Sequence, residues 1–178
     1  MRFEFATATR ILFGRGTARQ TGSIVEKMGR RDMCLASLFG GLALANSKLG
    51  AVHGFAGPLG GMYHAAHSAL CAAFLPAVME VNVKALEYRD PASVAMERYD
   101  EVARLITGLP AARAEDGIAW VRSLCKQLKI KPLGAYGIEK RDFADIVVKA
   151  GKASSMKGNP IELNKEELLK ILQNALQG

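Results

Sequence analysis

The stretch Gly50–Ala69, GAVHGFAGPLGGMYHAAHSA, contains every histidine of the 178-residue chain: His53, His64 and His67. The glycines and the single proline of this stretch are expected to break a helix, and such a kinked segment can bring His53 and His67 to one point. His64 and His67 are three residues apart, which places them on one face if that part is helical. Imidazoles are common ligands of divalent metals such as zinc and iron. Since no carboxylate at ligand spacing accompanies them, spacing alone favours ordinary core histidines over a metal site.

The sequence on both sides of this stretch predicts helices. Asp32 can cap a segment that is apolar nearly all round up to Lys48, as in a buried helix. Residues 66–86 resume a helix in which Pro76 forces a kink or a restart. Four more helices follow, the first starting at Asp90-Pro91 and stopping at Gly108–Pro110, and the last starting with a capping-box-like Asn164–Glu167. Their apolar faces are Ala95, Tyr99, Val102 and Ile106; Ile118, Val121, Leu124, Cys125 and Leu128; Phe143, Ile146, Val147 and Ala150; and Leu168, Leu172 and Leu176.

Residues 1–31 have a different pattern. Phe3 with Phe5, and Ile11 with Phe13, suit two short strands, and a helix then ends at Gly29. We therefore expect a mainly α protein, with a helical bundle-like domain over residues 32–178 and a short N-terminal β element within residues 1–31. Two short strands alone leave open edges, so we expect a homodimer formed through them.

Composition narrows the function classes. The 49% hydrophobic and 23% charged residues indicate a globular protein, and three dispersed cysteines without a CxxC pair favour a reducing, cytoplasmic compartment. The net charge is +7, but residues 32–125 contain seven basic and nine acidic side chains, so we expect no nucleic-acid partner. No stretch reaches the ~18 clean apolar residues of a membrane span, so we expect no membrane association. Strands do not alternate with helices after residue 31, which excludes a parallel nucleotide-binding sheet from this sequence.

The longer stretch Asn46–Asn82, NSKLGAVHGFAGPLGGMYHAAHSALCAAFLPAVMEVN, resembles the signature of the iron-containing (group III) alcohol dehydrogenases and the related maleylacetate reductases. The family pattern is roughly Gly-x-x-His-x-x-x-His-x-Leu-Gly, followed by Pro-His and then Leu-Pro. The resemblance implies that His53 and His67 correspond to two of the family's metal ligands. The family's intervening histidine, which is near the nicotinamide, corresponds to Gly57, and Ala66 replaces the proline that precedes the ligand.

The resemblance extends over residues 10–29 and 154–176, with a junction at Gly29–Asp32 where the family has its nucleotide-binding sheet. It implies an internally truncated, non-catalytic helical domain with half of the metal site. His53 and His67, with His64 as a third candidate ligand, would then bind zinc or iron weakly. No catalytic or cofactor-binding residue is assigned, and NAD(P) is not expected to bind. The alternative is that the chain still acts as a metal- and NAD(P)-dependent alcohol dehydrogenase, either by itself or with the missing parts supplied by another chain.

Overall fold

The computed structural model describes residues 34–35, 37–42 and 49–177. The chain divides into two compact units, Met1–Asn46 and Ser47–Gly178. In the first unit, residues 34–35 and 37–42 are helical, as the sequence predicts. The predicted strands around Phe3 and Phe13, the helix before Gly29, and the dimer contact through those strands lie outside the described residues. The boundary expected after residue 31 therefore stays a prediction.

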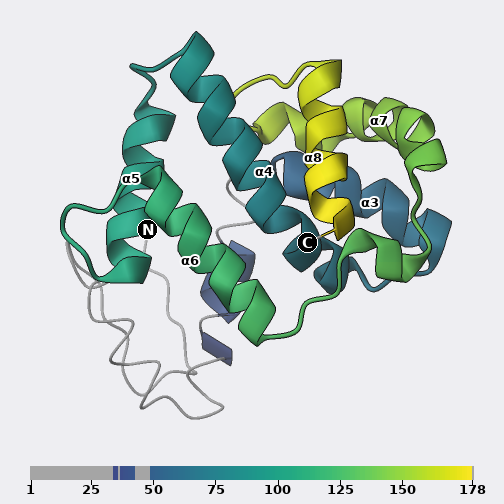
Figure 1. The fold of residues 1–178 in the computed structure, drawn as a ribbon, viewed down its shortest axis with the longest axis horizontal. Helices are drawn as coiled ribbons and strands as arrows, with labels where there is room; N and C mark the ends of the chain where they lie inside the picture. The colour runs from purple at the N-terminus through teal and green to yellow at the C-terminus, as the bar shows by residue number, and fades with distance from the viewer. Residues whose placement is uncertain (1–33, 36, 43–48, 178) are drawn as a thin grey trace, which may run out of the picture. The chain divides into compact units, whose positions relative to one another are not determined.

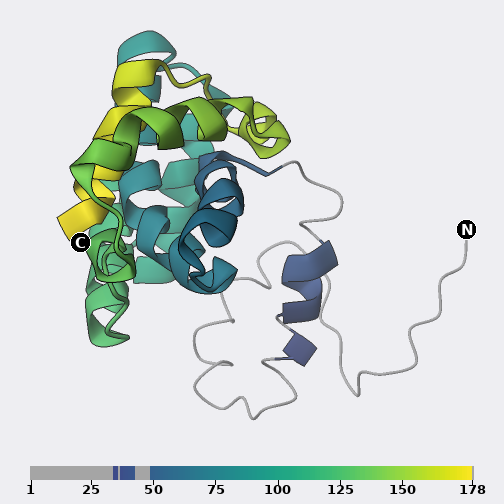
Figure 2. The same cartoon turned by 90° about the vertical axis from the view of Figure 1, so that its right-hand side faces the viewer.

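The second unit is built from six α-helices joined by turns and short 3₁₀ segments (Figure 1). The helices are α3 (Ala51–Tyr63), α4 (His67–Arg89), α5 (Val94–Thr107), α6 (Ala114–Gln127), α7 (Phe143–Lys152) and α8 (Lys165–Gln177), and the 3₁₀ segments are η2 (Leu133–Tyr136), η3 (Lys140–Asp142) and η4 (Ser154–Gly158). Helix α4 is central, because it packs against α3, α5, α6 and α8, while α7 covers α3 (Figures 1 and 2). Within residues 49–177 there is no strand, which confirms the mainly α class.

Neither the helix break expected around Pro58 nor a restart at Pro76 is found. Pro58 lies inside α3 and Pro76 lies inside α4, and both helices continue through them. A proline in a helix interior loses one backbone hydrogen bond, but each helix buries a long apolar face, and this packing outweighs the local cost. The predicted break within the opening stretch is instead confined to residues 64–66.

The helix ends partly follow the predicted signals. Asn164 and Glu167 form a reciprocal capping box at α8, since each side chain accepts the other's backbone N–H, at 2.9 and 2.7 Å. Gly108, with φ of 72°, ends α5 in the left-handed conformation that glycine adopts without strain. The predicted start of α5 at Asp90-Pro91 is wrong, because the cap is Ser93, whose hydroxyl accepts the N–H of Ala95 at 3.4 Å.

The main hydrophobic core is formed by α3, α4, α7 and α8 together with residues near η2. Its largest side chains, Phe55 of α3 and Phe74 of α4, are fully buried and stack with ring centroids 4.9 Å apart. The predicted apolar face of α7 is buried at all four positions. Leu128 is 63% exposed, contrary to its predicted place on the α6 face, because α6 ends at Gln127 and Leu128 is its C-cap.

Helix α4 is the one helix, among the described residues, that is long and apolar enough by length and composition to cross a membrane. Half of its apolar window is buried inside the protein. Its packing against four neighbouring helices accounts for the apolar composition, since a central core helix is hydrophobic on most of its surface.

Candidate metal centre

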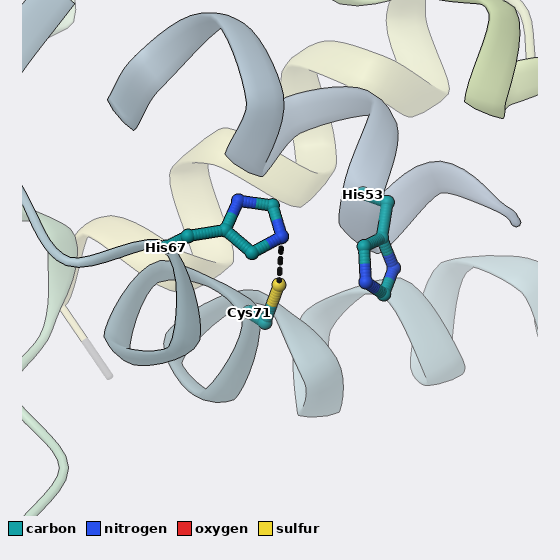
Figure 3. Close-up of side chains that lie close together, drawn as sticks. All are labelled: His53, His67 and Cys71. Atoms are coloured by element: carbon teal, nitrogen blue, oxygen red, sulfur yellow. Dashed lines mark hydrogen bonds between the residues drawn. The ribbon is translucent and has the colours of Figure 1, made fainter. Parts of the chain in front are cut away.

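The structure brings His53 and His67 together. His53 is in the first turn of α3 and is half-buried, whereas His67 is the first residue of α4 and is exposed. Their ring centroids are 5.3 Å apart and the ring planes are tilted by 48° (Figure 3). Each imidazole therefore reaches toward the other from a different helix, as the spacing of these two residues allows.

A network of two asparagines fixes the first turn of α3, and with it His53. The Oδ1 atom of Asn159 accepts the backbone N–H of Ala51 at 3.0 Å, which satisfies one of the free donors at the helix start. Asn159 also exchanges two side-chain hydrogen bonds with Asn82 of α4, at 2.8 and 3.3 Å. Asn82 is 2% exposed and in addition donates to the Tyr99 hydroxyl at 3.1 Å. The side chain of Asn159 thus links the start of α3 to the middle of α4.

Cys71 is the third member of the cluster, and the sequence analysis did not single it out. It follows His67 by one turn of α4, and its Sγ atom is 3.5 Å from His67 Nε2, within hydrogen-bond distance (Figure 3). His53, His67 and Cys71 each offer one potential ligand atom, and these atoms all lie within 4.8 Å of one another. The signal in the sequence was the i, i+4 spacing of His67 and Cys71, which places two side chains on one helix face.

The structure does not bring His64 into this cluster. His64 is the exposed C-cap of α3, with φ of 48° and ψ of 28°, in the left-handed region. Histidine is one of the few residue types that adopt this conformation with some frequency. Because residues 64–66 are not helical, the three-residue spacing that would align His64 with His67 does not apply there.

Burial determines the electrostatics of the cluster. It lowers the pKa of His53 below the usual value, and the neighbouring His67 lowers it further. Burial also raises the pKa of the Cys71 thiol. Among residues 49–177, no carboxylate joins the three side chains. Glu80, one of the acids nearest in the sequence, is instead hydrogen-bonded to Lys84, Arg122 and Asn174.

A groove of about 640 Å³ lies between α4, α6 and α8, away from the histidine cluster. It is lined by alanines and by basic side chains, among them Lys84, Arg122 and Lys126, and it contains none of the histidines. Glu80 forms ion pairs with two of these cations. Cys125 also lines the groove, but its thiol donates to the backbone oxygen of Ala72 at 3.8 Å, and the Glu80 carboxylate is paired with the cations. The histidine cluster, where three potential ligand atoms lie together, is therefore the better candidate site.

Comparisons with known proteins agree on one family. Residues 18–176 match the family model described as the Fe-containing alcohol dehydrogenase family, C-terminal. The chain is 31% identical over 153 residues to alcohol dehydrogenase 4 of Saccharomyces cerevisiae, which covers 85% of this chain and 38% of that protein. It is 34% identical over 155 residues to 1,3-propanediol dehydrogenase of Klebsiella pneumoniae, covering 82% of this chain and 37% of the relative.

The solved structures lead to the same group. An alcohol dehydrogenase from Oenococcus oeni superposes with a TM-score of 0.64 at 34% identity, over 76% of this chain and 34% of that one. A 1,3-propanediol oxidoreductase superposes with a TM-score of 0.60 at 32% identity, over 71% of this chain and 32% of that one. The chain thus spans 32–38% of the length of these relatives. With its helical fold and its family match over most of its length, the chain belongs to the iron-containing alcohol dehydrogenase family and corresponds to the family's C-terminal region.

Proposed function

We propose that this chain is a metal-binding helical domain that holds a divalent cation at His53 and His67 and has no alcohol dehydrogenase activity of its own. The observation that supports the metal is the approach of the two imidazoles to a centroid distance of 5.3 Å from separate helices. The family signature gives these two positions a ligand role in the relatives that they resemble. Neutral imidazoles suit zinc and iron, and zinc accepts a small number of ligands.

We infer the absence of alcohol dehydrogenase activity from the kinds of structure that the described residues form. Hydride transfer requires a nicotinamide held in contact with the substrate carbon, and this positioning accounts for much of the rate. A pyrophosphate is commonly held at a glycine-rich turn between a strand and a helix. Residues 49–177 contain helices and turns only, and no such turn is found among them. We therefore expect neither NAD nor NADP to bind this domain tightly.

Two measurements on the full chain test this proposal. Calorimetric titration with zinc should show one site per chain, and the double variant His53→Ala/His67→Ala should lose it, whereas His64→Ala should retain it. A thermal shift assay with NAD(H) should show no stabilisation. Stoichiometric zinc binding that survives the double substitution would mean that the metal is held elsewhere. Turnover of an alcohol with NAD or NADP that scales with purified protein and is lost in His53→Ala would contradict the absence of activity.

The similarity to alcohol dehydrogenase 4 and 1,3-propanediol dehydrogenase supports a second candidate function. In it, the chain is the metal-binding part of a two-chain alcohol dehydrogenase whose other chain supplies the nucleotide-binding region. A metal bound at His53 and His67 would polarise the oxygen of the alcohol. Addition of a separately expressed nucleotide-binding domain should then produce cofactor-dependent activity, and its absence across a panel of such domains favours the first proposal.

The internal truncation at Gly29–Asp32 is a further part of the proposal. It rests on the resemblance of residues 10–29 to the family's N-terminal strand and first helix and of residues 154–176 to its C-terminal end. The family match begins at residue 18 and so includes the junction, which makes an independent test necessary. The test is to sequence the native transcript across codons 29–32. We expect these codons to be continuous in the native gene. Their absence from the native transcript would contradict a natural deletion.

A further inference from the structure

We propose that Cys71 is the third protein ligand of this metal centre and that its thiolate makes the site select zinc-like, thiophilic cations. This inference rests on the proposed site at His53 and His67 and adds to it a ligand and a metal preference. Cys71 Sγ and His67 Nε2 are 3.5 Å apart, and the ligand atoms of all three side chains lie within 4.8 Å of one another.

The separation of the Cys71 and His67 ligand atoms matches a shared tetrahedral ion. With Zn–S of about 2.3 Å and Zn–N of about 2.05 Å, a tetrahedral angle separates sulfur and nitrogen by about 3.6 Å. The observed separation is 3.5 Å, so neither atom has to move away from or toward the other. A hydrogen bond between the two groups accounts for the same distance without metal, and the experiment below is designed to separate these cases.

Helix geometry places His67 and Cys71 where both can bind one ion. His67 and Cys71 are separated by one turn of α4, so both side chains project from one face of a single rigid element. The third ligand comes from α3, where His53 is fixed two residues after the Asn159-bound N–H of Ala51. Ligand atoms of a tetrahedral zinc ion lie about 3.3–3.6 Å apart, so a pair at the outer limit of 4.8 Å has to close by about 1 Å through side-chain rotation.

The charge of the ligand set also favours the thiolate. Two neutral imidazoles leave both positive charges of a divalent cation without a protein counter-charge. When the Cys71 thiol binds the ion, its sulfur forms the metal bond and its proton passes to the solvent, which leaves the complex with one positive charge. Thiolate is a soft ligand that selects zinc over magnesium or manganese, for which oxygen ligands are preferred.

The test uses the full reduced chain and cobalt(II), which replaces zinc in tetrahedral sites and gives visible absorption. Coordination by a thiolate adds a near-ultraviolet sulfur-to-cobalt charge-transfer band. Spectra are recorded for wild type, Cys71→Ser, Cys71→Ala and the matched control Cys125→Ser. Cys125 is also a free, half-buried cysteine, and burial likewise raises the pKa of its thiol, but it belongs to α6 and not to the cluster. Circular dichroism establishes that each variant is folded.

We expect the charge-transfer band in wild type and Cys125→Ser, and its loss in both Cys71 variants. Removal of a supporting residue outside the coordination sphere commonly lowers metal affinity by about 10–100-fold, so loss of a direct ligand should weaken zinc binding at least tenfold. Millimolar magnesium should not displace the cobalt. Cobalt that binds with tetrahedral d–d bands but no sulfur band would overturn the ligand role of Cys71 and leave the histidine site intact. If wild type binds no cobalt or zinc at all, both the proposed function and this inference fail.

A second measurement does not depend on any variant being folded. Wild type is alkylated with iodoacetamide with and without zinc, and the modified peptides are quantified by mass spectrometry. Zinc should slow modification of Cys71 at least tenfold and leave Cys125 unchanged, which serves as the internal reference. Equal rates for Cys71 with and without saturating zinc would contradict the inference.

Discussion

The helices of the second unit form two regions that differ in how much apolar surface they bury. The large core, formed by α3, α4, α7 and α8, contains 19 buried hydrophobic residues, whereas the cluster of α6 with the end of α4 contains three: Val83, Ala114 and Ile118. The α5–α6 hairpin instead exposes large apolar side chains, including Val94, Val102, Leu105 and Trp120. The proposed metal ligands lie on α3 and α4, two helices of the large core, so the geometry of the site should depend on that core and little on the hairpin.

The largest expected effect would come from the centre of the large core. Phe74→Ala should lower the free energy of unfolding by about 4 kcal/mol, because it removes a fully buried ring that stacks on Phe55. The matched substitution in the hairpin is Ile118→Ala, for which we expect about 2 kcal/mol, the lower end of the range for a buried aliphatic side chain. Urea unfolding followed by circular dichroism measures both. Equal losses would show that the two regions do not differ in stability as their burial indicates.

A smaller effect is expected for the link between the core and the metal site. Asn159→Ala leaves the N–H of Ala51 and the buried amide of Asn82 without their partner, which should cost about 3 kcal/mol. The same substitution should weaken zinc binding, because His53 is two residues beyond Ala51 in α3. The control is Asn174→Ala on α8, which loses one hydrogen bond to Glu80 and should cost about 1 kcal/mol without any effect on zinc. Indistinguishable variants would exclude a positioning role for Asn159.

These features show how far the sequence alone could lead. The apolar face of α7 and the capping box of α8 were predicted correctly, because both signals are local and repeat at helical spacing. A break at Pro58 and a restart at Pro76 were predicted wrongly, because the packing that outweighs a lost hydrogen bond comes from distant segments. The kink at Pro76, the other predicted outcome, stays a prediction. Cys71 was missed although it follows His67 at helical spacing, since a cysteine becomes a candidate ligand only once His53 is known to lie beside it. The Asn82–Asn159 network joins residues 77 positions apart, which no local pattern reveals.

The space around one glycine in each region shows how tightly that region is packed. A Cβ atom on Gly117 of α6 would lie 3.0 Å from Ala103 Cβ and 3.2 Å from its Cα, and these atoms can move only if α5 moves. A Cβ atom on Gly54 of α3 would meet the end of the flexible Met156 side chain, at 2.6 Å from Cε. Gly117→Ala should therefore cost about 1–2 kcal/mol after the gain in helix propensity, and Gly54→Ala should be neutral within about 0.5 kcal/mol. Thermal unfolding of the pair measures this, and the reverse order would mean that the core is less adaptable than the hairpin.

The smallest expected effect on stability is that of Glu80, whose carboxylate on α4 forms an ion pair with Arg122 on α6 and so connects the two regions. Its carboxylate accepts hydrogen bonds from Lys84 on α4 at 2.7 Å, from Arg122 on α6, and from Asn174 on α8 at 3.0 Å. Burial of this side chain, which is 20% exposed, opposes ionisation. The hydrogen bond from Lys84 and the charge of Arg122 outweigh that cost, so the pKa of Glu80 is lowered.

A lowered pKa in the folded state means that the ionised carboxylate stabilises the fold. This contribution is fully present above the pKa of the unfolded chain, about 4.3, and is lost as the pH falls through the lower pKa of the folded protein. Glu80→Gln should therefore cost about 1 kcal/mol at neutral pH, the value of a typical hydrogen bond, and the difference from wild type should vanish in acid. The matched control Glu101→Gln, at an exposed position of α5, should be indistinguishable from wild type at every pH. Urea unfolding between about pH 3 and pH 7 measures the profile across the titration range of glutamate. A constant loss over that range would mean that Glu80 joins the regions through packing and not through its charge.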